Sequence, residues 1–197
     1  GYVVSGYKLF SRHSFGVAWV SDRLATVPHD QLAGAPENVW ELGTRDASAY
    51  AAFSEVVRYL EWLGAEVSPG GAPRQLIEAA AAAIRGQEQD LVDAMMWGTG
   101  GLLGLGQLDT VTVVGPDNSE HRSGMISFMI DGIDGPSAVD SLNADGVRTH
   151  ARKADYYSAG VLGPLGIKSC VRVSASHYNS RAEVEQFLAT VNRLAAA

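Results

Sequence analysis

Apolar residues recur at helical spacing in two long segments of the chain. In Ser48–Leu63 they fall three and four positions apart, which predicts an amphipathic helix that Gly64 ends. These apolar positions are Tyr50, Phe53, Val56, Val57, Leu60 and Leu63. A break rich in glycine and proline, residues 68–73, follows, and Pro73 opens an alanine-rich helix through about Met96. The pattern therefore predicts two long helices separated by an internal boundary.

Short runs of β-branched and aromatic residues predict the strands. Tyr2–Ser5 and Phe15–Ser21 flank a turn that carries Lys8. Residues 108–115 and 123–132 suggest an antiparallel pair, because a short polar turn at residues 116–122 separates them. Two further strands are predicted at residues 147–151 and 170–176.

The remaining segments predict short helices and loops. Residues 135–146 form a short helix with proline near its start and glycine at its stop, and residues 152–169 form a helix plus a loop. Ser180 and Glu183 make a capping box that starts the last helix. Residues 32–47 lack periodicity and predict an extended loop. This order predicts an α+β fold with helices on one face of a small antiparallel sheet.

Composition narrows the class of protein. The 197 residues are 46% hydrophobic, enough for a sizeable core, and the net charge is -7. Without a lysine or arginine cluster, we expect no nucleic-acid partner and no membrane partner. No apolar run is long enough to span a bilayer, and Cys170 is the sole cysteine, which excludes an intrachain disulfide. We therefore expect a cytoplasmic protein that handles small ligands.

Common catalytic motifs are missing from the sequence. The glycine run at residues 98–106 fits no GxGxxG placement, and it follows a predicted helix rather than a strand. The five histidines lack ligand spacing, so we expect no metal site. No GxSxG motif is present, so a serine hydrolase has no support.

Two cationic residues stand in unusual places. Lys8 follows a strand end in "SGYK", where Ser5 and backbone amides could hold an anion while the lysine forms an imine. Arg172 lies in a predicted strand, where alternation sends it to the same face as Ser174 and Ser176. Arg172 is either a surface residue or a guanidinium held in position to bind a carboxylate. Lys8 is likewise either a catalytic amine or a surface residue whose stem covers apolar neighbours.

Five segments occur in one order along almost the whole chain. They are "SGYKLF…FGVAWVSDRL", "WELGTRDASAYAAFSEVVRYLEWLG", "SGMISFMIDG", "GVRTHARKADYYSAGVLGPLG" and "CVRVSASHYNSRAEVEQFL". Together they resemble the C-terminal half of fold type I pyridoxal-phosphate enzymes of the class V aminotransferase and cysteine desulfurase group. The resemblance implies that residues 1–47 end the large cofactor domain. Residues 48–197 then form the linking helix and the C-terminal small domain.

The resemblance also assigns roles to residues. Lys8 matches the catalytic lysine that joins the pyridoxal 5'-phosphate cofactor as a Schiff base, and later serves as a general base. Ser5 and Tyr7 align with two residues of the family that bind the cofactor phosphate, although Tyr7 replaces the family's histidine. Thr44 matches a threonine that reaches the cofactor phosphate of the neighbouring subunit in a dimer. Arg172 matches the arginine that binds the substrate's α-carboxylate bidentately.

The sequence departs from the desulfurases at their persulfide-forming cysteine. Tyr157 stands where we align that cysteine, and we expect the thiol of Cys170 to point away from the substrate. The resemblance implies an enzyme acting on an amino acid, with C–S bond cleavage by a lyase that lacks the usual cysteine as the leading reaction. Aminotransferase and epimerase activities stay open. Candidate substrate contacts lie at Arg152, Lys153, Asp155, Tyr156 and Tyr157.

A second departure concerns the cofactor domain. In the family, the partner of the pyridine nitrogen, the stacking aromatic and most of the phosphate cup precede the lysine, whereas seven residues precede Lys8 here. We expect a second polypeptide to carry the N-terminal half of the fold, with a dimer mate besides. The alternatives are a truncated fragment and a non-catalytic scaffold subunit; a scaffold would need none of Lys8, Thr44 and Arg172.

Overall fold

The computed structural model describes residues 1–36, 39–116 and 122–196. The chain forms two compact units, Gly1–Ala81 (unit 1) and Ala82–Ala197 (unit 2), and each is described by itself. This division falls within a long helix. The division at residues 47 and 48, which follows from the family's domain plan, stays a prediction.

Unit 1 begins with a hairpin. β1 (Tyr2–Ser5) pairs antiparallel with β2 (Gly16–Trp19), and Tyr2 lies opposite Trp19. The connection holds a 3₁₀ helix, Gly6–Leu9, so Lys8 lies on a turn between two paired strands, as predicted. A single helical turn, α1 (Asp22–Ala25), follows β2.

The two long helices are confirmed, with one correction. α2 spans Ala47–Val67 and α3 spans Pro73–Trp97, so Gly64 lies inside α2 and the prediction that it ends the helix is wrong. A Cβ at Gly64 would lie 1.9 Å from the carbonyl oxygen of Leu76. Glycine is present because the two helix backbones approach each other closely there, which leaves no room for a side chain.

Unit 2 contains a four-stranded antiparallel sheet in the order β3-β4-β6-β5. Its strands are β3 (Val111–Val114), β4 (Met125–Ile130), β5 (His150–Lys153) and β6 (Ser169–Ser174). Its helices are α4 (Gly135–Ala144), α5 (Ala159–Leu162), α6 (Arg181–Ala195) and a 3₁₀ turn, Leu105–Gln107. Most of the polar turn predicted between β3 and β4 lies outside the described residues.

One predicted strand begins later than expected. β5 starts at His150 rather than at Val147, because the Val147 N–H donates to the carbonyl of Leu142 and closes the end of α4. Gly146 supplies the positive φ of 80° that this helix ending needs. The capping box of α6 is confirmed, with the Ser180 hydroxyl accepting from the Glu183 N–H.

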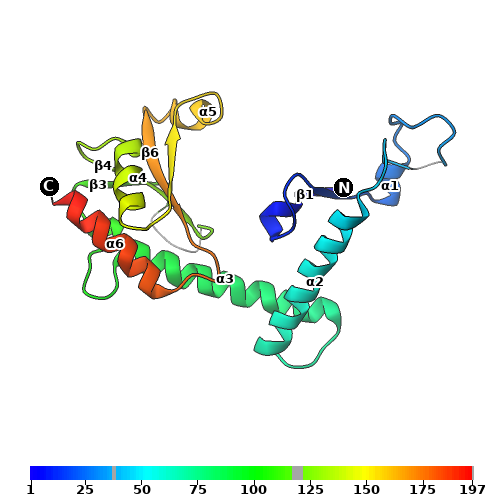
Figure 1. The fold of residues 1–197 in the computed structure, drawn as a ribbon, viewed down its shortest axis with the longest axis horizontal. Coiled ribbons are helices and arrows are strands. Elements are labelled where there is room, and N and C mark those ends of the chain that lie inside the picture. Colours follow the sequence, from blue (N-terminus) through cyan, green and yellow to red (C-terminus); the bar gives the residue numbers. More distant parts are fainter. Residues whose placement is uncertain (37–38, 117–121, 197) are drawn as a thin grey trace. The chain divides into compact units, whose positions relative to one another are not determined.

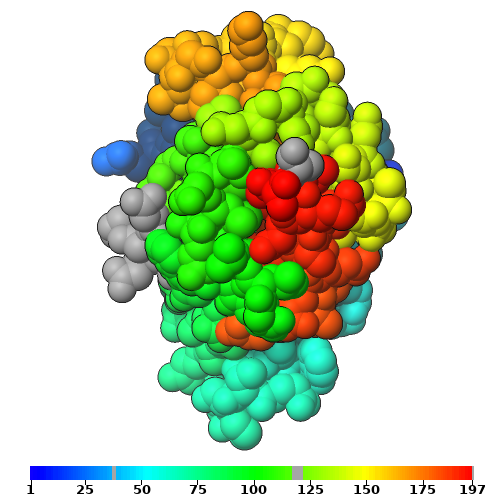
Figure 2. Space-filling model, turned by 90° about the vertical axis from the view of Figure 1, so that its left-hand side faces the viewer, coloured from blue at the N-terminus to red at the C-terminus, as the bar shows by residue number. Residues whose placement is uncertain are grey.

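Helices cover one face of the sheet. Figure 1 shows α4 and α6 beside the strands, and Figure 2 shows α6 (red) at the surface, flanked by green and yellow segments of the same unit. The sheet contributes Ile126, Phe128, Ile130, Val171 and Val173 to the buried core. The second half of α3 contributes Leu91, Val92, Met95 and Met96, and α4 and α6 contribute Leu142, Phe187, Leu188 and Val191. The predicted α+β architecture with helices on one sheet face is therefore confirmed.

Candidate functional site

The turn that carries Lys8 is held by its glycine. The Gly6 N–H donates to the carbonyl of Phe15 at 2.7 Å, and a Cβ on Gly6 would lie 2.8 Å from the Phe15 ring. Ser5 stands at the cap position of the 3₁₀ helix, yet its side chain makes no capping hydrogen bond. The strand end therefore presents a hydroxyl that the turn itself does not use.

Lys8 and its neighbour Tyr7 both face outward. The Tyr7 ring stacks on His13 with centroids 4.9 Å apart, and the Lys8 Nζ lies 5.8 Å from the centroid of the Tyr7 ring. The side chain of Lys8 is exposed, and none of the ion pairs of the described residues includes it. Its amine is thus accessible to a carbonyl compound.

The loop that carries Thr44 is tied to the turn after β1. Arg12 donates to Ser48 at 2.7 Å and forms an ion pair with Asp46 at 2.7 Å, two residues beyond Thr44. Hydrogen bonds from Ser48 and from the Ala49 N–H lower the pKa of Asp46, and the charge of Arg12 lowers it further. The contact anchors the start of α2 to the segment that follows Lys8. Thr44 itself is exposed.

Arg172 lies on a central strand of the sheet in unit 2. In the strand register it stands opposite Ser127 of β4 and opposite His150 of β5, while Cys170 stands opposite Arg152. Directly opposed residues of antiparallel strands share a face, as do residues two apart on one strand. The five side chains therefore lie on one face of the sheet, opposite the helix-covered core.

This register corrects our expectation for Cys170. Its thiol shares a face with Arg172 and does not point away from it, because positions 170 and 172 have the same strand parity. Cys170 is 1% exposed, and burial raises the pKa of its thiol, against smaller opposing effects of Arg152 and Arg172. A buried thiol with a raised pKa is a poor nucleophile.

The guanidinium of Arg172 is half-buried and carries no partner charge. Burial lowers its pKa, and the nearby charge of Arg152 lowers it further. Among the described residues, the ion pairs do not include either arginine. Arg172 is thus a fixed cation on a strand, available to an anion from outside the chain.

Tyr157 occupies an exposed turn of unit 2. Its side chain is 77% exposed, its ring lies 4.2 Å from that of Tyr156, and its N–H donates to Asp155. Of the predicted site residues, Ser5, Tyr7, Lys8 and Thr44 lie in unit 1, and Tyr157 and Arg172 lie in unit 2. Ser127 and His150 beside Arg172 were not among the predictions, because the register between separate strands places them there.

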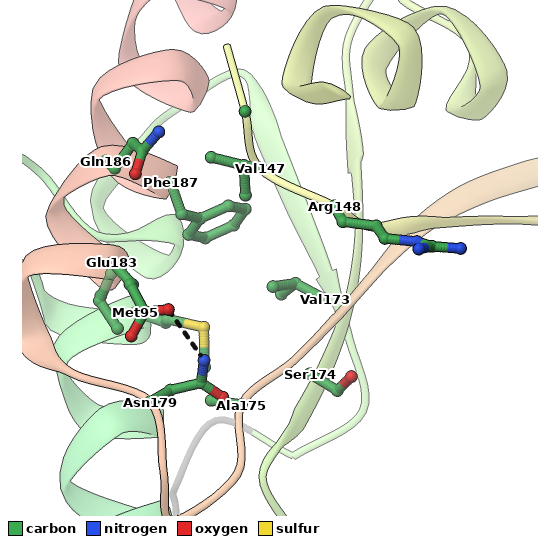
Figure 3. Close-up of a pocket in the computed structure, with 12 residues that line it drawn as sticks. Met95, Val147, Arg148, Val173, Ser174, Ala175, Asn179, Glu183, Gln186 and Phe187 are labelled. Carbon is green, nitrogen blue, oxygen red and sulfur yellow. Dashed lines mark hydrogen bonds between the residues drawn. The ribbon is translucent and has the colours of Figure 1, made fainter. Parts of the chain in front are cut away.

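A cavity of about 280 Å³ opens on the helix side of the sheet. Its apolar lining comes from Met95, Val147, Val173, Val184 and Phe187 (Figure 3). Three of its polar side chains bond within the fold, since Asn179 donates to Glu183 at 3.2 Å and Gln186 donates to the carbonyl of Asp145 at 2.8 Å. Arg148 and Ser174 line the cavity as well. Arg172 points to the face of β6 opposite Val173 and does not line the cavity, whereas Ser174, which shares the face of Arg172, does line it.

Two further searches cover only the part of the chain that the structure describes. There, no group of three or more His, Cys, Asp or Glu side chains could hold a metal ion. In the same residues, no helix is both long and apolar enough to cross a membrane.

The chain is similar to cysteine desulfurases in sequence and fold. Probable cysteine desulfurases 2 and 1 of Mycobacterium leprae (strain TN) are 25% and 24% identical to it, over 96% and 98% of this chain but 43% and 30% of their own length. The apo cysteine desulfurase of Thermococcus onnurineus NA1 superimposes with a TM-score of 0.74 at 22% identity, covering 98% of this chain and 46% of that one.

The E. coli cysteine desulfurase CsdA superimposes with a TM-score of 0.63 at 20% identity, covering 98% of this chain and 45% of that one. The chain thus spans less than half the length of the relatives it matches. These likenesses show the fold of a type I pyridoxal-phosphate enzyme. The model of the aminotransferase class-V family matches residues 2–187, and the chain belongs to this family of pyridoxal-phosphate enzymes.

Proposed function

We propose that this chain is the lysine-bearing part of a pyridoxal-phosphate enzyme that acts on an amino acid. The observation that carries the proposal is the exposed amine of Lys8 on a turn preceded by Ser5, whose hydroxyl makes no capping hydrogen bond. A non-catalytic scaffold would need neither group in this arrangement.

The residues present fit the cofactor. Lys8 would hold its aldehyde carbon, and Ser5, Tyr7 and Thr44 are the residues of this chain that would hold its phosphate. When bound, the cofactor supplies an electron sink for the bonding electrons of the substrate Cα. Lys8 then moves the proton at Cα, which requires its amine to be neutral.

Arg172 fixes the substrate. Its guanidinium is planar and presents parallel N–H donors, so it binds the α-carboxylate bidentately and restricts the amino acid to one orientation. The half-buried position of Arg172 in a central strand supports this role, because the strand limits the side chain's freedom. Arg172 joins no ion pair among the described residues, so its guanidinium is available.

The proposed reaction is C–S bond cleavage without a protein persulfide. Tyr157 stands at the aligned position of the persulfide cysteine, and Cys170 is too deeply buried to replace it. We therefore assign a lyase that releases the sulfur species directly. A keto acid that keeps the whole side chain of the substrate would instead identify an aminotransferase, and an inverted amino acid would identify an epimerase.

We also propose that a second polypeptide completes the site and that the assembly contains a dimer mate. Large apolar side chains of unit 1 are exposed in this chain, with Tyr2 at 71%, Val3 at 76% and Trp19 at 64%. Exposed apolar area of this kind is usually covered by another surface. A soluble, monodisperse monomer of this chain alone, measured by light scattering, would contradict the proposal.

Replacement of Lys8 tests the catalytic role in the assembled enzyme. Lys8→Ala removes the amine that moves the Cα proton, so we expect turnover to be abolished while the fold, measured by circular dichroism, is unchanged. Lys168→Ala, at an exposed lysine of unit 2, is the matched control and should turn over normally. Turnover by Lys8→Ala would refute the role.

Replacement of Arg172 tests the carboxylate site. Arg172→Ala should weaken amino-acid binding by about 2 to 5 kcal/mol, the usual loss when one partner of a hydrogen-bonded charge pair is truncated. The affinity is measured by calorimetry. An affinity equal to that of the wild type would remove Arg172 from the site.

A further inference from the structure

Two arginines share the sheet face that lies opposite the core of unit 2. We call this surface the arginine face. From the strand register its members are Ser127 on β4, His150 and Arg152 on β5, and Cys170 and Arg172 on β6. All five lie in unit 2, so the surface is defined within one compact unit.

The arginine face is strongly biased in charge. The remaining strand positions of this parity are Thr112, Val114, Met125, Met129 and Ser174, so the face carries two arginines, a histidine and no carboxylate. Within the described residues neither Arg152 nor Arg172 joins an ion pair. Like charges on neighbouring strands destabilise a sheet, and a bound anion offsets that cost.

The two arginines are diagonal neighbours. Arg152 stands directly opposite Cys170, and Arg172 is the next residue of β6 on the same face. Such diagonal pairs lie roughly 7 to 8 Å apart at their backbones, within reach of long side chains. The lowering of the Arg172 pKa by Arg152 agrees with this proximity. Each guanidinium can bind one carboxylate bidentately.

We propose that Arg152 binds a second carboxylate, carried by the substrate side chain beyond its C–S bond, so that the enzyme acts on a sulfur-containing dicarboxylic amino acid. This inference rests on the proposed function, in which Arg172 binds the α-carboxylate. A small molecule with two carboxylates neutralises both guanidiniums at once, whereas a neutral side chain leaves Arg152 without a counterion. Arg152 is then the residue that determines specificity.

The test compares how the assembled enzyme binds acids and their amides, which carry no C–S bond and so report on side-chain charge alone. L-Aspartate and L-glutamate differ from L-asparagine and L-glutamine in side-chain charge but hardly in shape, and calorimetry gives the four dissociation constants. We expect the acids to bind at least tenfold more tightly than the amides. In Arg152→Gln the ratio should fall to about one, and Arg152→Lys, which keeps the charge, should restore part of it.

Arg172→Gln separates the inference from the function on which it rests. It should weaken all four ligands, while the exposed control Arg181→Gln should change none. If Arg172→Gln weakens all ligands but Arg152→Gln keeps the wild-type ratio, the dicarboxylate inference is overturned and the α-carboxylate site stands. If Arg172→Gln has no effect, or no ligand binds, both are overturned.

Discussion

The two compact units of the chain differ in how they bury their apolar residues. Of the buried apolar residues among those described, unit 1 contributes only Ala49, Val56 and Ala80, and the rest belong to unit 2. Unit 2 encloses both rings of an edge-to-face pair, Phe128 and Phe187, with centroids 5.8 Å apart. Both units expose large apolar side chains, such as Tyr2, Val3 and Trp19 in unit 1 and Tyr156 and Val161 in unit 2, so the difference lies in the buried core.

The difference separates a unit with a sizeable buried apolar core from one with few buried apolar residues. Burial of apolar area is the main stabilising contribution to folding, so unit 2 has what it needs within this chain. Unit 1 carries the proposed Schiff-base lysine but buries few of its own apolar side chains. The proposed aldehyde-binding amine thus lies on the unit with the smaller buried core.

The largest effect should come from truncating the core of unit 2. Phe187→Ala removes a ring that is 2% exposed and leaves a cavity, so we expect unfolding of unit 2 to become easier by about 3 to 5 kcal/mol. Denaturant unfolding measures this free energy. The matched change Trp19→Ala, at a ring 64% exposed, should stay within about 0.5 kcal/mol. Equal losses would erase the contrast between the units.

A smaller effect should follow from filling the helix contact of unit 1. Gly64→Ala places a methyl group against the Leu76 carbonyl, and overpacking of this kind costs about 1 to 3 kcal/mol. In Gly86→Ala the new methyl group meets nothing within 4 Å, so this helical control should gain about 0.5 to 1 kcal/mol. Thermal denaturation followed by circular dichroism distinguishes the two. A Gly64→Ala protein as stable as the wild type would refute the close approach.

Loss of a helix cap should lower the free energy of unfolding by less than the change at Gly64. Ser180→Ala removes the acceptor for the Glu183 N–H at the start of α6, with an expected cost of about 1 kcal/mol in urea unfolding. Ser141→Ala is the control, because its hydroxyl only bonds back to the carbonyl one turn earlier in α4. If both variants lose the same stability, the cap contributes nothing specific.

The smallest effect should appear on acidification of unit 2. Hydrogen bonds from Thr190 and from Arg193 lower the pKa of Asp145 below its usual value. Because the folded pKa is the lower one, the contribution of Asp145 is complete above its unfolded pKa and is lost as the pH falls through the folded pKa. Below about pH 4, the free energy of unfolding of Asp145→Asn should therefore fall less steeply with pH than that of the wild type. If the stability of Asp145→Asn fell with acidification as steeply as that of the wild type, this prediction would be contradicted.

Local patterns in the sequence predicted most of the elements. The three-and-four spacing in residues 48–63 and the Ser180–Glu183 capping box correctly placed helices, since helix periodicity and caps are local properties. Gly64 was misassigned as a helix stop because its role depends on Leu76, and no local pattern reports a tertiary approach.

The candidate site was less predictable than the fold. The strand that holds Arg172 followed from alternation, but its neighbours Ser127 and His150 depend on the register between strands that are distant in sequence. The wrong orientation expected for Cys170 had a different origin, because strand parity alone placed it beside Arg172. The tie between Arg12 and Asp46 likewise joins segments that no local pattern connects.

The measurement that tests the central claim most directly is mass spectrometry after borohydride reduction in the presence of pyridoxal 5'-phosphate. The chain has only three lysines, Lys8, Lys153 and Lys168, so peptide mapping distinguishes adducts on these three, and fragment spectra distinguish Lys8 from the α-amine of Gly1. The account predicts a reduced pyridoxyl adduct on Lys8, together with a second polypeptide in the purified assembly. A chain that is alone and unmodified at Lys8, or modified equally at all three lysines, would contradict it.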